Sequence, residues 1–149
     1  MPLKDILRKE AIVLDLEAED KFAVIKKLID HLASEGIIDE SCRDTAIKEA
    51  IAREKLMPTG LENGVAVPHA ISDGIECHGA VFGRLKNPVD FGAQDGIDCD
   101  LIFLILIHPE PQVPYVQILS QIVRVFREED NREKARKAVT AEEIYSLFT

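Results

Sequence analysis

The stretch Asp100–Ile107, with the sequence DLIFLILI, decides the fold class, because every residue after the aspartate is apolar. Pro109 follows closely and would end a strand there, since proline cannot donate to a β-ladder. A short apolar run of this kind is typical of a central β-strand that is covered on both faces. It is far too short to cross a bilayer as a helix, which needs about 20 apolar residues. We therefore expect a β-sheet between two layers of helices.

Strand and helix patterns alternate on either side of this run. Further strands are predicted at residues 11–16, 65–67 and 80–85. Helices are predicted over residues 20–36, 41–54, 115–126, 132–138 and 141–147. The link between the last two strands is too short for a helical crossover, so we expect that pair to be antiparallel. The sequence thus predicts an α/β protein, a three-layer α/β/α sandwich with a small mixed β-sheet, as a single domain over residues 1–149.

Two of the predicted helices have a clear apolar face. In the first, Asp20 is placed to cap the N-terminus and Gly36 to end the helix, because glycine tolerates positive φ. Its apolar residues recur at helical spacing at Phe22, Ile25, Leu28, Ile29 and Leu32. In the helix over residues 115–126, the residues expected to face inward are Val116, Leu119, Ile122, Val123 and Phe126. Both helices are expected to pack on the sheet.

The charge balance restricts the kind of partner. The chain carries a formal net charge of −9, which argues against nucleic acid and anionic membranes, because their phosphates would be repelled. A basic protein partner is compatible with this charge. The N-terminal sequence MPLKDILRKE lacks the apolar core of a signal peptide. We expect a cytoplasmic protein without direct insertion into a membrane.

The three cysteines, Cys42, Cys77 and Cys99, are widely spaced. An odd number at such spacing gives neither a disulfide framework nor a paired metal site, so we expect reduced thiols. A metal cluster, a Ser/His/Asp triad and a Walker-type loop are all missing from the sequence. We expect neither a cofactor nor a metal.

The stretch from Arg53 to Ala70, REKLMPTGLENGVAVPHA, holds the strongest candidate for chemistry. It ends a short buried strand at Pro68-His69, and proline restricts the backbone around it. A neutral imidazole is a nucleophile near pH 7 and could accept a phosphoryl group on one ring nitrogen. The alternative is a structural histidine whose ring satisfies a loop carbonyl. The residue types alone leave both interpretations open.

At these residues the sequence resembles a known family. Glu54, Leu61 and the run Val65–Ala70 (VAVPHA) are similar to the active-site signature of enzyme IIA components of the bacterial phosphoenolpyruvate-dependent phosphotransferase system. The group resembled is the mannitol/fructose type (type 2), which includes the nitrogen-regulatory enzyme IIA. NPVDFGAQDG at 87–96 and TAEEIYSLF at 140–148 extend the resemblance over nearly the whole chain. One position departs from the signature, because Glu62 stands where the family has a small residue.

The resemblance implies roles for individual residues. His69 matches the histidine that accepts a phosphoryl group from the phosphocarrier HPr, or from its nitrogen-branch relative. Arg53 matches the arginine near the phosphoryl group, and its planar guanidinium suits phosphate; the alternative is a solvated residue at a helix C-terminus. Thr59 could donate a further hydrogen bond to phosphate. The histidine would then pass the group to an enzyme IIB domain, or its phosphorylation state would serve as a regulatory signal.

A second departure concerns the helix after the apolar strand. Many family members carry another histidine at its start, where this sequence has Tyr115. A phenol can donate one hydrogen bond but is neutral at pH 7. His108, at the end of the apolar strand, is the other candidate to replace the second histidine. Tyr115, His108 or neither could take that role.

Two function classes therefore remain open. The first is a phosphotransferase that works through a phosphohistidine, either in sugar uptake or in nitrogen regulation. The second is a binding module of the same fold that docks on a regulatory target without being phosphorylated, which Glu62 and Tyr115 would favour. Neither the branch, nor the sugar, nor the oligomeric state can be read from the sequence.

Overall fold

The computed structural model of the protein describes residues 3–110 and 115–149. Within them the strands are β1 (Ile12–Leu16), β2 (Val65–Ala66), β3 (His69–Ile71), β4 (Gly79–Val89) and β5 (Cys99–Ile107). The α-helices are α1 (Lys21–Ser34), α2 (Arg43–Leu56), α3 (Tyr115–Arg127), α4 (Glu129–Lys137) and α5 (Ala141–Tyr145). Short 3-10 helices cover Leu3–Asp5, Lys9–Ala11 and Glu40–Cys42. These bounds agree with the predicted elements to within a few residues, apart from β3 and the longer β4.

The five strands form one mixed sheet with β5 at its centre. The strand order is β1-β4-β5-β2, and β3 also pairs with β5, so that β2 and β3 share one edge. β4 and β5 are antiparallel, as the short link predicts, whereas β1 is parallel to β4 and both β2 and β3 are parallel to β5. The apolar run 101–107 is buried along its whole length. The prediction of a central strand covered on both faces is confirmed.

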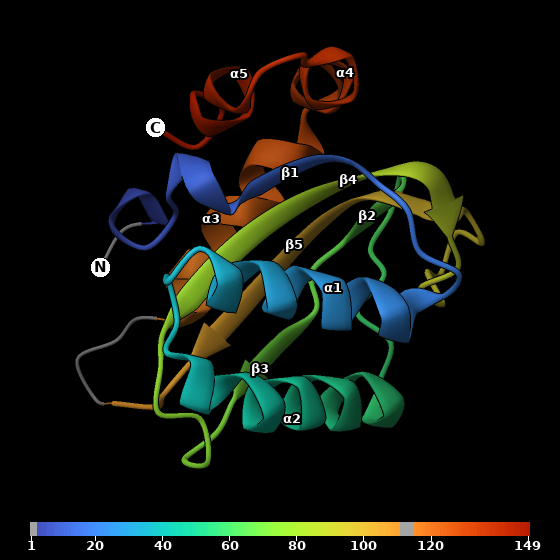
Figure 1. Ribbon diagram of the computed structural model, residues 1–149. Coiled ribbons are helices and arrows are strands. Elements are labelled where there is room, and N and C mark those ends of the chain that lie inside the picture. Colours follow the sequence, from blue (N-terminus) through green and yellow to red (C-terminus); the bar gives the residue numbers. More distant parts are fainter. Residues whose placement is uncertain (1–2, 111–114) are drawn as a thin grey trace.

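Helices cover both faces of this sheet (Figure 1). On one face α1 lies over β4 with α2 beside it, and a side chain at Gly83 would come within 2.8 Å of Leu28. On the other face, aromatic rings of the sheet meet rings from the C-terminal part of the chain: Phe82 lies 5.8 Å from Phe126, and Phe103 lies 5.0 Å from Phe148, between ring centres. The predicted three-layer α/β/α sandwich is confirmed.

The first helix begins and ends where the sequence predicts. Asp20 caps α1 by accepting a hydrogen bond from the Ala23 backbone N–H at 2.8 Å. Gly36 has a φ of +70°, a left-handed conformation that glycine adopts without a steric penalty. All but one of the predicted apolar residues are fully buried, and Phe22 is half-buried. The helical spacing therefore identified the buried face correctly.

The strand β3 was missed by the sequence analysis, which ended the strand before it at Pro68-His69. Pro68 has no N–H, so the ladder with β5 is interrupted after Ala66. Pairing resumes directly afterwards, with His69 opposite Ile105 and Ile71 opposite Ile107. Proline therefore divides one edge of the sheet into two short strands instead of ending it.

The inward face predicted for the helix over 115–126 is partly wrong. Ile122 and Phe126 are buried as predicted, but Ile118 is buried in place of Val116 and Val123, which are exposed. Leu119 is half-buried. The predicted apolar stripe was too wide for the strip of helix surface that the sheet covers. Part of the apolar face of α3 therefore points away from the core.

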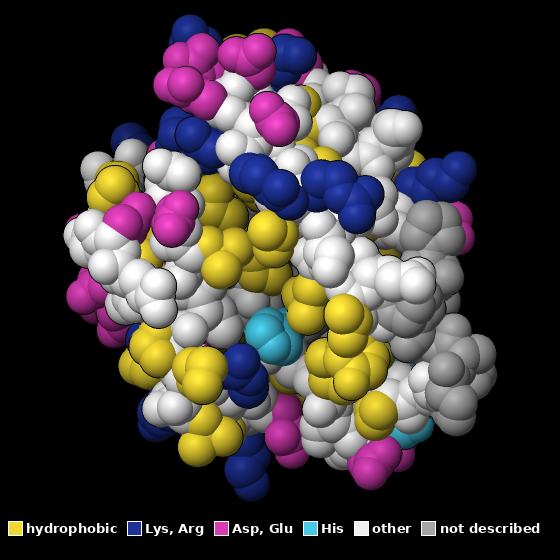
Figure 2. Space-filling model, turned by 180° about the vertical axis from the view of Figure 1, so that it is seen from behind, with side chains coloured by type: hydrophobic (Ala, Val, Ile, Leu, Met, Phe, Trp, Pro, Cys, Tyr) yellow, Lys and Arg dark blue, Asp and Glu magenta, His cyan; other side chains and the backbone are white. Residues whose placement is uncertain are grey.

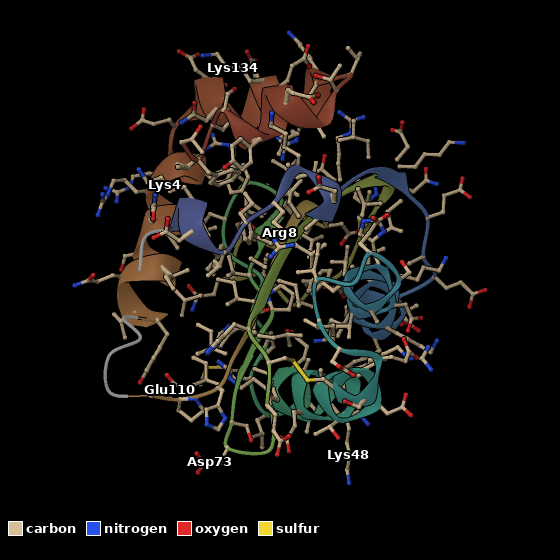
Figure 3. The ribbon with its side chains drawn as sticks, turned by 60° about the vertical axis from the view of Figure 1, so that its left-hand side comes forward. Lys4, Arg8, Lys48, Asp73, Glu110 and Lys134 are labelled. Carbon is tan, nitrogen blue, oxygen red and sulfur yellow. A yellow bond between two sulfur atoms is a disulfide. The ribbon has the colours of Figure 1, made fainter. Side chains whose placement is uncertain are left out.

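The expectation of three reduced thiols is also wrong. Cys42 and Cys77 form a disulfide, and Cys99 is free and buried. The S–S bond lies beside α2 (Figure 3) and ties the start of this helix to the loop between β3 and β4. The pair is separated by 35 residues in the sequence. Only the tertiary fold brings the two cysteines together.

Candidate active site

His69 is the first residue of β3 and lies at the edge of the sheet. Its backbone is held by the pairing with Ile105 on β5, and Pro68 before it is buried. The side chain itself is half-buried. A rigid backbone on one side and partial exposure on the other give the ring a fixed position at the surface.

A backbone carbonyl determines which ring nitrogen of His69 is available. The distance from Nδ1 to the Val67 oxygen is 2.8 Å, and since a carbonyl only accepts, Nδ1 carries the proton and donates it. In the neutral ring, Nε2 then holds the lone pair. Nε2 is therefore the nucleophilic atom of this histidine.

The surroundings keep this ring neutral. Burial lowers the pKa of His69 below its usual 6.5, and the positive charge of Arg53 lowers it further, whereas the hydrogen bond to Val67 and the charge of Glu54 act in the opposite direction. The balance favours the uncharged imidazole, because desolvation penalises the cation. A neutral ring near pH 7 is the form that a nucleophile requires.

Arg53 lies in the last turn of α2, close enough for its charge to act on the His69 ring. Its Nη1 donates a hydrogen bond to the Met57 carbonyl at 2.9 Å, just beyond the end of the helix. A guanidinium has five N–H donors, so this bond occupies only part of its capacity. The structure places the charge of Arg53 within electrostatic range of the His69 ring.

Glu54 is a buried residue of this site to which the sequence analysis assigned no role. Its carboxylate accepts hydrogen bonds from the Thr59 backbone N–H at 2.9 Å and from the Thr59 hydroxyl at 2.5 Å. Lys21 on α1 forms an ion pair with it at 3.3 Å. The sequence contained one indication of this role. A glutamate in the last turn of a helix is unfavourable to the helix dipole, so its presence there suggests that its carboxylate has a specific partner.

These bonds also determine what Thr59 does. Both its hydroxyl and its backbone N–H point to Glu54, and the residue is buried. In this arrangement Thr59 fastens the loop after α2 to the helix and does not face open solvent. A hydrogen bond from its hydroxyl to phosphate would require the bond to Glu54 to break first.

The loop between α2 and β2 folds back along the segment that precedes His69. Val67 N–H donates to the Thr59 carbonyl at 3.1 Å, and Leu61 N–H donates to the Val65 carbonyl at 2.7 Å. Gly60 fits here because it has no side chain: a Cβ would come within 2.8 Å of the Phe91 carbonyl. The loop thus supports the backbone that carries the Val67 oxygen.

A cavity of about 530 Å³ opens beside this loop. Apolar side chains from the loop, from β2 and from α3 line it, among them Leu61, Val65 and Val123. Its charged residues are Glu62 and Arg127. Figure 2 shows a face of the molecule on which hydrophobic side chains surround a histidine ring, with basic side chains near them. An apolar hollow of this size can receive a side chain from another protein.

His108 lies away from His69. It follows the end of β5, three residues beyond Ile105, which pairs with His69, and this offset corresponds to about 10 Å along the strand. Its Nδ1 donates to the Ile75 carbonyl at 2.7 Å, and its backbone N–H donates to Nδ1 of His78 at 3.3 Å. The structure therefore places His108 with the loop between β3 and β4, where its ring and backbone bond to Ile75 and His78.

Tyr115 is the first residue of α3 and is exposed. The neighbouring Val116 is exposed as well. Both are on α3, the helix whose later residue Val123 lines the cavity. A role for its hydroxyl in phosphoryl transfer stays a prediction.

Two other kinds of feature are missing from residues 3–110 and 115–149. Within them, no group of three or more His, Cys, Asp or Glu side chains is arranged to hold a metal ion. Every helix of the same part of the chain is too short or too polar to cross a membrane.

Comparison with known proteins gives one consistent family. Residues 5–149 match the family described as "Phosphoenolpyruvate-dependent sugar phosphotransferase system, EIIA 2". A nitrogen regulatory protein of Bradyrhizobium diazoefficiens is 32% identical over 99% of this chain and 95% of its own. A fructose-specific EIIA component of Haloferax volcanii is 31% identical over 93% of this chain and 89% of its own. The crystal structure of the nitrogen regulatory protein IIA-Ntr from Neisseria meningitidis superposes with a TM-score of 0.87 at 31% identity, covering 99% of both chains.

Proposed function

The chain belongs to the EIIA 2 family of the phosphoenolpyruvate-dependent sugar phosphotransferase system, and from this premise we propose that it carries phosphoryl groups on Nε2 of His69. The observation that carries the proposal is the hydrogen bond from Nδ1 to the Val67 carbonyl, which leaves Nε2 as the nucleophile. The donor is an HPr-type phosphocarrier whose own histidine is phosphorylated. The acceptor is an enzyme IIB domain or a regulatory target.

The transfer is a single displacement at phosphorus. The Nε2 lone pair forms a new N–P bond while the N–P bond of the donor breaks, and the donor imidazole leaves with the electron pair. His69 keeps its proton on Nδ1 throughout, so the phosphorylated ring carries a positive charge. The Val67 carbonyl at 2.8 Å stabilises that charge, because hydrogen bonds to charged donors are stronger than neutral ones. The same step in reverse passes the group to the acceptor.

Arg53 stabilises the phosphoryl group while it is in transfer. Phosphoryl transfer spreads negative charge over three oxygens, and catalysis relies on positioning and on fixed positive charge. The guanidinium meets this need from the end of α2, where its bond to Met57 orients it. In transfer the remaining N–H groups of Arg53 bind the phosphoryl oxygens.

The surface beside His69 supports docking of a protein donor. Several of the large hydrophobic side chains that the structure leaves exposed lie on the two elements next to the site, at Leu56, Met57, Val116 and Val123. The cavity opens between α3 and the loop that follows α2, and Met57 and Val123 both line it. An apolar centre of this kind suits transient contact between proteins, because it buries hydrophobic area without fixed charge pairs.

Membership of this family is compatible with both branches, sugar uptake and nitrogen regulation. The nitrogen regulatory protein and the fructose-specific component differ by one percentage point in identity to this chain, 32% against 31%. The site handles phosphate and protein surfaces in either branch. We therefore leave the downstream target as a class, a IIB domain or a regulatory protein.

The proposal is tested by incubating the protein with phosphoenolpyruvate, enzyme I and HPr and measuring its intact mass. The expected result is the gain of one phosphoryl group, labile in acid and stable in alkali, as N-phosphohistidine is. The matched control is His69→Gln, which removes the nucleophile and keeps a polar side chain. A protein that stays unmodified with donors of both branches would instead be a binding module that regulates its target without phosphorylation.

A further inference from the structure

We propose that Arg136 on α4 is a positioning residue for His69, because it fixes the turn at Asn63–Gly64 from which the chain enters the segment before the histidine. The inference rests on the proposed transfer at His69 for its functional consequence. Its structural part, that Arg136 determines how the His69 ring is held, stands separately. Arg136 is 67 positions after His69 in the sequence.

The guanidinium of Arg136 joins three parts of the chain. It pairs with Asp100 in a bidentate arrangement, with Nε 3.0 Å from one carboxylate oxygen and Nη2 3.0 Å from the other. Nη2 also donates to the Asn63 carbonyl at 2.7 Å. Since Asp100 belongs to β5, the arginine connects α4, the centre of the sheet and the loop in one contact. A planar fork of donors is suited to this geometry.

The turn that Arg136 contacts has an unusual backbone. Asn63 and Gly64 both have positive φ, at +63° and +82°. A non-glycine residue in this conformation persists only where its surroundings hold it. Asp95 holds the Asn63 N–H at 2.8 Å, and Arg136 holds the Asn63 carbonyl. The backbone N–H and the backbone C=O of Asn63 are therefore both held by side chains.

Gly64 makes room for the arginine. A Cβ on Gly64 would lie 2.6 Å from Nη2 of Arg136 and 3.0 Å from the Asp100 carboxylate. The guanidinium therefore lies directly against the backbone of the turn. The Gly64 carbonyl accepts hydrogen bonds from the N–H groups of Asp100 and Leu101, at 3.0 and 3.1 Å, which sets the start of β2 on β5.

A short series of hydrogen bonds leads from this turn to the histidine. Beyond the turn, Val65 and Val67 bond back to the loop through Leu61 and Thr59. The carbonyl of Val67 then accepts the Nδ1 proton of His69. A displaced turn would move that carbonyl, and a displacement of about 1 Å near reacting atoms can cost a factor of about 10² in rate.

The base of Arg136 is itself fixed. Arg84 on β4 donates to the last carbonyls of α4, at 3.1 Å to Ala135 and 3.3 Å to Arg136, and also pairs with Asp15 at 3.2 Å. A cation at the C-terminal end of a helix is favourable to the helix dipole. The end of α4 is therefore anchored to the sheet, and the Arg136 side chain extends from a fixed point.

The test compares phosphoryl transfer by Arg136→Gln with two matched variants on the same helix. Arg132→Gln removes an arginine that donates to the Phe126 and Arg127 carbonyls, away from the loop. Lys137→Gln removes one positive charge next in sequence to Arg136. We expect Arg136→Gln to slow transfer by about tenfold, a loss of transition-state positioning. Arg136→Lys should recover part of the rate, and both controls should stay near wild type at a temperature where all are folded.

A second measurement reads the histidine directly. Nitrogen-15 NMR of the His69 imidazole reports which ring nitrogen carries the proton. Arg136→Gln should raise the fraction protonated on Nε2, whereas Arg132→Gln should not change it. Wild-type transfer together with a wild-type imidazole spectrum in Arg136→Gln overturns the inference, as does an equal change in both arginine variants. If Arg136→Gln does not fold, the same two readings on Arg136→Lys decide.

The NMR arm also separates this inference from the proposed function. If the wild-type protein accepts no phosphoryl group, the proposed function fails, but the imidazole spectra still show whether Arg136 determines the state of His69. If the wild type is phosphorylated and the Arg136→Gln spectrum is unchanged, the function stands and the inference fails.

Discussion

Two histidines in this molecule are oriented in the same way but placed in different surroundings. His69 donates its Nδ1 proton to the Val67 carbonyl at 2.8 Å, and His108 donates its own to the Ile75 carbonyl at 2.7 Å. Both rings therefore present Nε2 as the basic nitrogen. The orientation of a histidine by a carbonyl is thus not enough to identify an active site. What differs is the neighbourhood of each ring.

The two regions are also held together by different means. Around His69, hydrogen bonds and ion pairs involving Glu54, Thr59 and Arg136 fasten the loop. Around His108, the loop between β3 and β4 is tied to the start of α2 by the Cys42–Cys77 disulfide. Arg53 and the apolar cavity lie on the His69 side. The candidate catalytic residues therefore lie at the start of β3, and the disulfide stabilises the loop after its end.

The largest expected effect is that of His69→Gln, which should abolish phosphorylation and leave the fold intact. The variant removes the nucleophile while the backbone pairing with Ile105 stays possible. Intact mass after incubation with the donor measures labelling, and circular dichroism checks the fold. Full labelling of this variant would show that another residue accepts the phosphoryl group, and the contrast between His69 and His108 would lose its basis.

Arg53→Gln should slow transfer by roughly 10² to 10³, the usual loss when one oriented charge is removed from a reaction centre. Arg53→Lys should recover only part of the rate, because an ammonium cannot donate two parallel hydrogen bonds. Single-turnover transfer from phosphorylated HPr measures the rates. A wild-type rate for Arg53→Gln would mean that Arg53 acts only at the end of α2, through Met57.

Loss of the disulfide should reduce stability and leave transfer nearly unchanged. Opening a cross-link over a separation of 35 residues is expected to lower the free energy of unfolding by about 3–4 kcal/mol. Urea unfolding of the wild type, with and without reductant, measures this difference, and the Cys42→Ser/Cys77→Ser double variant is the control. A slower transfer in the folded, reduced protein would show that the two ends of β3 are coupled after all.

The pH dependence should reflect the lowered pKa of His69. Burial lowers the folded-state pKa of His69 below the usual 6.5, so the ring is neutral at pH 7, and transfer should fall as the pH drops below 6.5. The unfolded chain binds this proton more readily, so the contribution of His69 to stability is present above pH 6.5 and is lost as the pH falls to the folded-state pKa. Transfer rates and urea midpoints from pH 5 to 8 test this, with His69→Gln as the reference. A transfer midpoint above 6.5 would contradict the desolvated ring.

The smallest effects are expected for the two candidates to replace a second histidine. His108→Ala should change transfer by less than about threefold, because the residue lies about 10 Å along the strand from His69. Tyr115→Phe removes one hydroxyl from an exposed residue and should also have only a modest effect. A loss of tenfold or more in either variant, measured in the same single-turnover assay, would identify that residue as a participant.

Much of the fold could be predicted because the local signals agree with the tertiary structure. The apolar run 101–107, the Asp20 cap and Gly36 all behave as their residue types require. The failures have physical reasons. Pro68 interrupts a ladder that resumes at His69, and Val116 and Val123 form an apolar strip that faces outward and not the core. A surface that docks a partner and a surface that packs on a sheet have the same composition.

The candidate site was predictable only in part. His69 and Arg53 lie in one continuous stretch of sequence, and the structure places the charge of Arg53 within electrostatic range of the His69 ring. The contact of Arg136 with Asn63 joins residues 73 positions apart, and the Cys42–Cys77 bond joins residues 35 apart. No periodicity or spacing in a single sequence encodes such contacts. The bond from Thr59 to Glu54 shows the same limit, since a polar residue in a loop does not reveal which partner it faces.

The loop over residues 59–61 has a consequence for how the protein behaves at high concentration. β2 and β3 form one edge of the sheet, and an uncovered edge would offer a row of free N–H and C=O groups on which another chain could assemble as a further strand. Outward-facing groups of this edge are already bonded, because Leu61 N–H donates to the Val65 carbonyl and Val67 N–H donates to the Thr59 carbonyl. The two strands are also only two and three residues long. The loop that supports the segment before His69 thus also protects the sheet from aggregation along its edge.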